Sequence, residues 1–339
     1  MDYREAARQI GKGRVQPVYV LYGTEIYLMR EFISYLTDQW VGREDREFAV
    51  SRFDLSETNV EAVVDDALTP PFFGSRKLIV AGDADFFTAA KSSSGIDHHT
   101  DRLAEYLESP AEFSVIVFTV RADKLDERKK LVKGIKQLGG LVPFPPLDAD
   151  ELAQWVRRQA DRLGFALEEG AEQAIIMSCG ANLQAIAGEM EKLALFAGPQ
   201  GKVGKADVER MVAQSTEQNV FVMIDELVNL RVDRALELFH ELLRRKEDPA
   251  KITALMARQF RNMLLIKRLA EQGFSQQQIA ARLSLHPYAV KVGAGQARRF
   301  HADKLRAIIR ELAEADYRMK TGQIDKVLAL ELFMLGLAG

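Results

Sequence analysis

The sequence predicts an α/β domain with a parallel sheet, followed by a region that is entirely helical. Two observations lead to this prediction. In the first 145 residues, short β-branched runs alternate with amphipathic helical patterns. Continuous apolar strands separated by helices are typical of a parallel sheet covered on both faces. Beyond Pro146 no convincing strand remains, whereas apolar residues recur at helical spacing.

Five runs rich in β-branched and aromatic residues predict the strands of the sheet. They are Val18–Tyr22, Phe48–Phe53, Leu78–Val80, Val115–Phe118 and Leu141–Val142. The helices predicted between them are Ile26–Trp40, Val60–Leu68, Leu103–Leu107 and Arg128–Leu138. We expect the segment from Phe86 to Asp101 to be a surface insertion.

A run of prolines, Pro143-Phe144-Pro145-Pro146, marks the end of the α/β domain, because proline neither donates to a sheet nor continues a helix. Asp148 and Glu151 then have the spacing of a capping box at the start of a helix. A second boundary falls near Gln214–Glu217. The helices expected between the boundaries are Ala149–Leu163, Glu168–Ser178, Leu183–Phe196 and Ala206–Val212. The expected domains are 1–146, 147–214 and 215–339.

Composition and charge exclude several classes of protein. The 339 residues are 47% hydrophobic and 28% charged, as in a globular protein. A single cysteine, Cys179, excludes an intrachain disulfide and an all-cysteine metal site. The charged start of the chain has no signal peptide, and the longest apolar runs are far shorter than the ~20 residues that cross a bilayer. We therefore expect a cytoplasmic protein without membrane contact.

The first strand leads into Gly23-Thr24-Glu25-Ile26, where a phosphate-binding loop would lie in a nucleotide-binding α/β domain. Such a loop needs several glycines, a lysine for the β- and γ-phosphates and a Ser or Thr for Mg²⁺. Here only Gly23 is present, no lysine follows, and Glu25 would repel a triphosphate. The sequence therefore argues against an ATP site.

No other set of residues assembles a catalytic centre. His98 and His99 lie in the polar insertion beside Asp97 and Asp101, where a solvated loop is the simpler interpretation than a metal site. Cys179 precedes Gly180 at a helix end and is interpreted as a packed or half-exposed thiol. We expect no catalytic residue, no metal and no cofactor.

A positive signal is the stretch Leu68-Thr69-Pro70-Pro71-Phe72-Phe73-Gly74. The two prolines stop the preceding helix, and two adjacent aromatic side chains follow on a short loop. Aromatic side chains on a preorganised loop are good anchors for the pocket of a partner. The sequence leaves two interpretations open: Phe72 and Phe73 bind a partner, or both fold back into the core of their own domain.

A second signal is local charge. Residues 251–310 contain twelve Lys or Arg against Glu271 and Asp303 only, so this region could face a phosphate backbone, an acidic neighbour or simply solvent. Within it, Ser275 and His286-Pro287 begin two short helices in the manner of a helix-turn-helix. The second helix has few side chains that could bond to base edges, so a packed helix pair is favoured over DNA reading.

Several fragments taken in order resemble one family, the δ subunit of the bacterial DNA polymerase III clamp loader. The similarity covers the whole chain. The matching fragments are Pro17–Gly23, Pro71–Arg76, Lys124–Lys130, Glu189–Leu193, Asn219–Phe221, Gln259–Arg261 and His286–Lys291.

The resemblance implies an AAA+-like α/β domain, a three-helix lid and a helical collar. In the family, δ binds no ATP and opens the ring-shaped sliding clamp with apolar side chains on a loop. That loop matches Phe72 and Phe73, with Leu68, Pro70 and Pro71 shaping it. Some relatives have an aliphatic residue in place of the first aromatic. Gln184 stands where ATP-hydrolysing relatives have an arginine that senses the γ-phosphate.

The implied partners are the sliding clamp (β), the δ′ and τ/γ subunits through the collar, and primer-template DNA within the complex. Lys320 and Gln323 are the candidates for DNA contact. The resemblance implies no enzyme activity for the isolated chain, which would be a subunit of a DNA-directed DNA polymerase holoenzyme. Two alternatives are an AAA+ ATPase with a divergent phosphate loop and a helix-turn-helix DNA-binding regulator.

Overall fold

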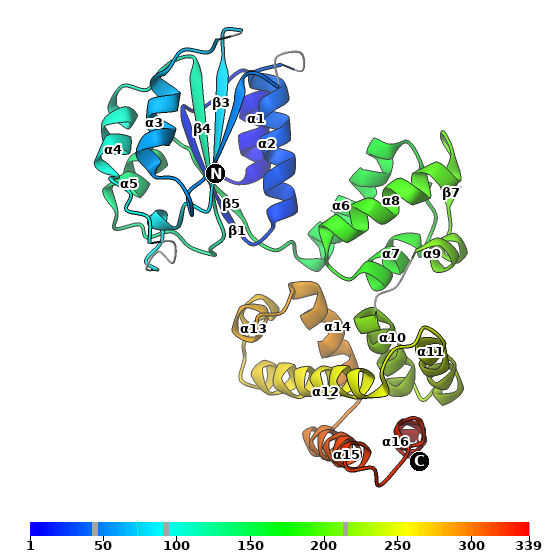
Figure 1. Ribbon diagram of the computed structural model, residues 1–339. Helices are drawn as coiled ribbons and strands as arrows, with labels where there is room; N and C mark the ends of the chain where they lie inside the picture. The colour runs from blue at the N-terminus through cyan, green and yellow to red at the C-terminus, as the bar shows by residue number, and fades with distance from the viewer. Residues whose placement is uncertain (43–46, 73, 91–94, 213–215, 339) are drawn as a thin grey trace. The chain divides into compact units, whose positions relative to one another are not determined.

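The computed structural model describes residues 1–42, 47–72, 74–90, 95–212 and 216–338 (Figure 1). The chain forms two compact units, Met1–Pro146 and Leu147–Gly339. The further division of the second unit into 147–214 and 215–339 stays a prediction. Among the described residues, no helix is both long and apolar enough to cross a bilayer.

A five-stranded parallel sheet forms the centre of the first unit, which confirms the predicted α/β class. Its strands are β1 (Val18–Gly23), β2 (Val50–Asp54), β3 (Lys77–Gly82), β4 (Ser114–Val120) and β5 (Leu141–Phe144). They lie in the order β2-β3-β4-β1-β5. The three central strands consist almost entirely of buried apolar residues, as expected for a sheet covered on both faces.

Helices cover both faces of the sheet, with α1 and α2 on one side and α3, α4 and α5 on the other (Figure 1). Their bounds are α1 (Tyr3–Gly11), α2 (Ile26–Trp40), α3 (Val60–Leu68), α4 (Asp101–Glu108) and α5 (Lys130–Gln137). The sequence prediction missed α1, which Asp2 caps by accepting a hydrogen bond from the Glu5 N–H at 2.7 Å. It gave α2 and α3 with the observed bounds.

Two local predictions in the first unit are wrong. The segment from Phe86 to Asp101 is not a surface insertion at its start, because a short 3-10 turn (Asp85–Phe87) buries Phe87 completely. The Phe87 ring packs on Phe118 of β4 with centroids 5.2 Å apart. Strand β2 begins at Val50, so Phe48, expected in the strand, lies outside it.

The second unit is largely helical, as predicted. Its helices are α6 (Ala149–Leu163), α7 (Ala171–Cys179), α8 (Leu183–Ala197), α9 (Lys205–Met211), α10 (Thr216–Val228), α11 (Val232–Arg244), α12 (Pro249–Glu271), α13 (Gln276–Leu283), α14 (Pro287–Ala297), α15 (Ala302–Lys320) and α16 (Lys326–Ala338). The predicted capping box of Asp148 and Glu151 begins α6. The expectation of no strand is wrong in one place, where β6 (Ala166–Leu167) pairs in parallel with β7 (Lys202–Val203). Two residues are too few to show a period of two.

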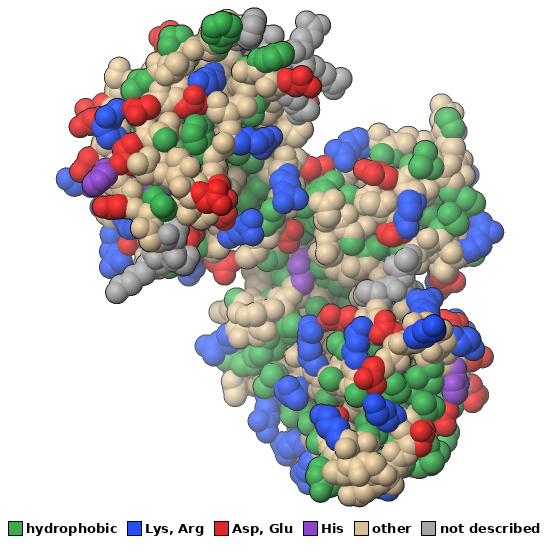
Figure 2. Space-filling model, viewed as in Figure 1, with side chains coloured by type: hydrophobic (Ala, Val, Ile, Leu, Met, Phe, Trp, Pro, Cys, Tyr) green, Lys and Arg blue, Asp and Glu red, His purple; other side chains and the backbone are tan. Residues whose placement is uncertain are grey.

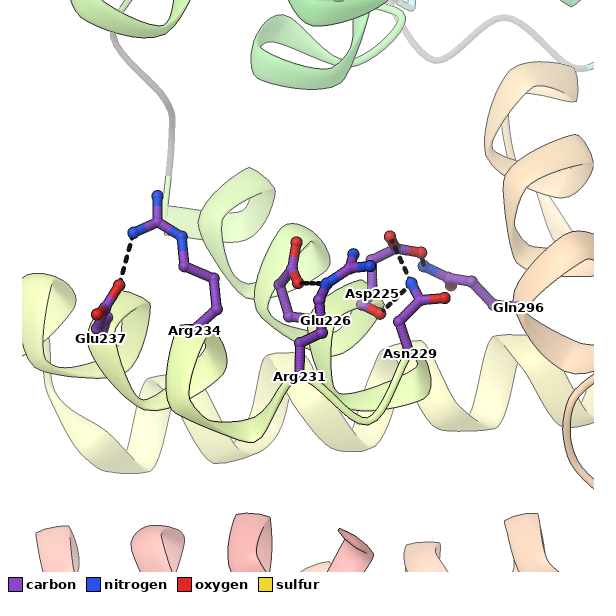
Figure 3. A network of polar contacts seen from close by, with 7 residues as sticks. All are labelled: Asp225, Glu226, Asn229, Arg231, Arg234, Glu237 and Gln296. Atoms are coloured by element: carbon purple, nitrogen blue, oxygen red, sulfur yellow. Dashed lines mark hydrogen bonds and ion pairs between the residues drawn. The ribbon is translucent and has the colours of Figure 1, made fainter.

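Helices α10, α11, α12, α15 and α16 share one apolar core, in which Phe239 and Phe260 are completely buried. A polar network supports one side of it (Figure 3). There the Gln296 amide in α14 donates to Asp225 of α10 at 3.0 Å and accepts from Gln259 of α12 at 3.2 Å. Asn229 also donates to the Asp225 carboxylate, at 3.1 Å. Helices α13 and α14 pack on α12 through Ile279, Val290 and Ile266, which confirms the packed pair favoured from the sequence.

Candidate functional site

The loop between α3 and β3, residues 69–76, presents apolar side chains to solvent. The Phe72 side chain is 92% exposed, and Leu68, the last residue of α3, is 49% exposed. Pro70 is also exposed and Pro71 is half-buried. Phe72 therefore does not fold back into its own core, which excludes that interpretation for this residue. Phe73 lies outside the described residues.

Local sequence explains why the chain leaves the helix here. The Thr69 hydroxyl donates to the Asp65 carbonyl oxygen at 2.8 Å and so satisfies one of the last carbonyl groups of α3. Pro70 and Pro71 cannot extend the helix. Gly74 has φ +73°, a backbone conformation that is nearly free of steric cost only for glycine. We call residues 69–76 the Phe72 loop.

Contacts beneath the Phe72 loop tie down both of its ends. At its base, the Lys77 ammonium lies 2.6 Å from Asp66 Oδ1 and 3.0 Å from the Asp66 carbonyl oxygen. The Arg76 guanidinium stacks 4.3 Å above the centroid of the Trp40 ring. The Trp40 indole N–H donates to the Lys77 carbonyl oxygen at 3.1 Å. A loop held in this way loses little conformational entropy when its tip binds a partner.

One further apolar side chain lies at this edge of the sheet and was not predicted from the sequence as a site residue. Phe48 is 70% exposed and immediately precedes Ala49, whose carbonyl oxygen accepts from the Leu78 N–H at 2.8 Å. That bond places Phe48 beside the point where the Phe72 loop enters β3. The sequence has no separate signal for this role, because Phe48 begins the run that predicts a strand, and a strand residue can point into the core.

The loop that follows β1 is packed against the sheet, in contrast to the exposed Phe72 loop. A Cβ added at Gly23, which has φ +140°, would lie 2.0 Å from the Phe144 carbonyl oxygen of β5. The Glu25 N–H donates to that same oxygen at 3.2 Å. Burial raises the pKa of the Glu25 carboxyl from its ordinary 4.5 to about 7. This backbone is bonded to β5, whereas a phosphate loop needs its amides directed toward the ligand.

Cys179, His98 and His99, the other residues considered for chemistry, pack against or pair with neighbouring side chains. Burial raises the pKa of the Cys179 thiol to about 12, so the reactive thiolate is disfavoured. The His98 ring packs against Phe86, with centroids 5.1 Å apart. His99 lies 3.9 Å from a Glu61 carboxylate oxygen. Across the described ranges, no three His, Cys, Asp or Glu side chains are grouped as metal ligands.

The basic region of the second unit is partly neutralised by ion pairs. Arg258 pairs with Glu217 at 2.8 Å and Lys291 with Asp150 at 3.2 Å. The cations of residues 251–310 without an ion pair among the described residues are Arg261, Arg268, Arg282, Arg298, Arg299, Lys304 and Arg310. In Figure 2, Lys and Arg side chains are numerous on the visible face of the C-terminal helices.

The two DNA-contact candidates lie at the end of α15. The Lys320 ammonium is 2.7 Å from the Asp316 carboxylate one turn earlier, in an exposed pair. Gln323 is exposed in the turn before α16, and its N–H donates to the Arg318 carbonyl oxygen at 2.9 Å. Gln184 is exposed in the first turn of α8.

Comparisons with known proteins agree with this architecture. Residues 19–144 match the family model "DNA polymerase III, delta subunit", and residues 217–337 match "DNA polymerase III delta subunit, C-terminal domain". The DNA polymerase III subunit delta of Bacillus subtilis is 39% identical over 97% of this chain and 95% of its own length. A probable delta subunit of Aquifex aeolicus is 24% identical over 76% of this chain and 72% of its own length.

The solved structure of the B. subtilis DNA clamp loader delta protein is also similar. It covers 99% of both chains with a TM-score of 0.77 at 38% identity. An α/β unit followed by helices, shared over nearly the full length with this delta protein, is the architecture of a clamp-loader subunit. The chain belongs to the DNA polymerase III delta subunit family and is thus a delta subunit of the clamp loader.

Proposed function

We propose that this protein binds the sliding clamp through the Phe72 loop and opens it for loading onto primed DNA. The observation that carries the proposal is the 92% exposure of Phe72 on a loop whose two ends are tied down. Burying a phenylalanine contributes about 2–3 kcal/mol. Phe72 and Phe73 together would therefore supply several orders of magnitude in affinity, with Leu68, Pro70 and Pro71 shaping the surface around them.

Opening the clamp requires more than tight binding. A ligand shifts an equilibrium only by the difference between its affinities for the two states. The loop must therefore fit the open clamp better than the closed one. A rigid aromatic wedge would meet this condition if it fits a pocket beside the interface of the clamp better when the ring is open.

We further propose that the isolated chain does not hydrolyse ATP. The backbone at Gly23 and Glu25 is bonded to β5, and an ionised Glu25 would repel a triphosphate. In this proposal ATP acts in sister subunits of the DNA polymerase holoenzyme, in the cytoplasm, and controls when the Phe72 loop is available.

The collar, residues 215–339, is proposed to hold this subunit beside δ′ and τ/γ. An apolar stripe on α16 supports this role: Leu328, Leu332 and Leu335 are 46%, 53% and 52% exposed at helical spacing. A row of leucines half open to solvent is typical of a helix that packs against a partner.

Primer-template DNA is the remaining proposed partner, with Lys320 and Gln323 as candidate contacts. Lys320 would exchange its exposed pair with Asp316 for a phosphate. Exposed pairs of this kind contribute ~1 kcal/mol or less, so the exchange costs little. A contact to phosphate would weaken steeply as salt concentration rises.

The test of the proposed function is clamp binding by wild type and by Phe72→Ala/Phe73→Ala, with the clamp from the same organism. We expect the double variant to bind at least about 100-fold more weakly, which corresponds to ~2.7 kcal/mol. Leu195→Ala, a matched removal of an 86% exposed side chain on α8, should bind as wild type. Circular dichroism checks that all three are folded. Equal binding by the double variant would contradict the proposal.

A further inference from the structure

We propose that the ion pair between Lys77 and Asp66 is a clasp that positions the Phe72 loop for docking. Lys77 and Asp66 act as positioning residues, since neither is at the exposed tip. This inference rests on the proposed function, because it explains how the tip is kept ready for the clamp.

The clasp joins the two ends of the loop directly. Asp66 lies in the last turn of α3 and Lys77 is the first residue of β3. The Lys77 ammonium contacts both Asp66 Oδ1, at 2.6 Å, and the Asp66 carbonyl oxygen, at 3.0 Å. Two bonds from one ammonium fix the separation between helix end and strand start, and the loop must span that separation.

The clasp is shielded from water, unlike most ion pairs of this protein. The Lys77 side chain is 10% exposed and the Asp66 side chain 24%. Asp66 Oδ2 is buried and has no hydrogen-bond partner among the described residues. The carboxylate is therefore balanced by Lys77 in a setting where screening by solvent is weak.

The position of Lys77 is unusual for its strand. The next four residues of β3, Leu78–Ala81, are buried and apolar. A buried ion pair is no more stabilising than well-packed apolar residues, and such pairs can instead specify one conformation. The strand is also joined to its neighbour by the Lys77 N–H, which donates to the Phe113 carbonyl oxygen at 2.7 Å. These contacts indicate that the clasp serves the geometry of the loop more than the stability of the sheet.

A neighbouring ion pair provides a matched control. Asp65, one residue before Asp66 on α3, lies 2.7 Å from the Arg102 guanidinium of α4. Both side chains are largely exposed, at 64% and 49%, and the pair does not connect the loop ends. Removing it changes the charge of α3 by the same amount without releasing the loop.

Releasing the clasp has a distinct kinetic signature. If only a fraction of the molecules hold the loop in the binding conformation, the apparent Kd rises by the inverse of that fraction. The weaker binding is then due to a lower association rate. Removing a contact such as that made by Phe72 instead mainly raises the dissociation rate. The two kinds of residue can therefore be told apart in one binding experiment.

The experiment compares Asp66→Ala/Lys77→Met, Lys77→Arg and Asp65→Ala with wild type. Changing both partners together avoids leaving one charge buried alone. We expect Asp66→Ala/Lys77→Met to bind the clamp about 5- to 20-fold more weakly, through slower association at an unchanged dissociation rate. Lys77→Arg should retain most of the affinity, and Asp65→Ala should bind as wild type.

Amide hydrogen exchange of the free variants supplies a readout that is independent of the clamp. The amides of Thr69, Phe72, Gly74, Ser75 and Arg76 should exchange faster in Asp66→Ala/Lys77→Met, while β4 and residues 78–82 of β3 exchange as in wild type. Unchanged loop exchange would overturn the clasp. Normal clamp binding by this variant, when Phe72→Ala/Phe73→Ala fails to bind, would overturn the clasp and leave the proposed function intact. Normal binding by the Phe variant would overturn both.

Discussion

Two loops of the first unit differ in what they contact: the loop after β1 packs against the sheet, and the loop before β3 exposes an aromatic side chain. The loop after β1 is directed inward: the Phe144 carbonyl oxygen accepts from Glu25 and leaves no room for a side chain at Gly23. The Phe72 loop presents an exposed Phe72 side chain, and the Lys77–Asp66 ion pair and the stacking of Arg76 on Trp40 hold its ends. One α/β domain can therefore close one loop against its own sheet and expose an apolar side chain on another.

The physical difference is which groups each loop leaves available. A phosphate loop works through backbone amides, and here those near Glu25 are engaged within the fold. A protein-binding loop works through side chains, and Phe72 is presented by a backbone held at both ends. Changes at each loop should therefore affect different measurements, stability at the first and partner affinity at the second.

The largest expected effect is at Gly23. Gly23→Ala would place a methyl group 2.0 Å from a backbone oxygen at φ +140°, and we expect it to lower the free energy of unfolding by about 3 kcal/mol or more. Gly13→Ala is the control, since Gly13 has φ +77° with nothing within 4 Å of the added atom. Its cost should be about 1 kcal/mol. Urea unfolding measures both, and equal costs would mean that the loop is not closed against β5.

A smaller effect, dependent on pH, is expected at Glu25. Because burial raises its pKa from 4.5 to about 7, the folded state binds more protons than the unfolded state between these values. The stability contributed by Glu25 is then fully present below pH 4.5 and is lost as pH rises through 7. Glu25→Gln should therefore be stabilised relative to wild type more at pH 8 than at pH 5. Unfolding curves at pH 5 and pH 8 measure this difference. The same difference in unfolding free energy between Glu25→Gln and wild type at both pH values would contradict the raised pKa of Glu25.

The smallest expected effect concerns Phe48, at the edge of the outward loop. Phe48→Ala should weaken clamp binding by about 2- to 5-fold, because exposed side chains around a central anchor contribute less than the anchor itself. Stability should be unchanged, since the side chain is 70% exposed. Tyr35→Ala, on α2 against Gly11, is the control. A loss as large as that of the Phe72→Ala/Phe73→Ala variant would make Phe48 a second anchor.

The sequence was most informative where the signal is local and repeated. Helices α2, α3 and α6 have the predicted bounds. Their signals act within a few residues: a 3.6-residue apolar period in each, a side-chain N-cap at the start of α3 and α6, and a proline after α3. Helix α1, the buried Phe87 and the short pair of β6 with β7 were missed. Each depends on packing against segments far along the chain, or is too short to show a period.

By itself, the sequence determined the five strands of the first unit and the helices α2 to α5 between them, the lack of a lysine and of further glycines after β1, and two aromatic residues behind two prolines. The tertiary structure decided that Phe72 faces solvent, that Phe48 lies beside its loop, and that Lys77 meets Asp66. The reason is physical: local pattern sets backbone conformation, whereas exposure and ion pairing depend on which distant segments the sheet brings together.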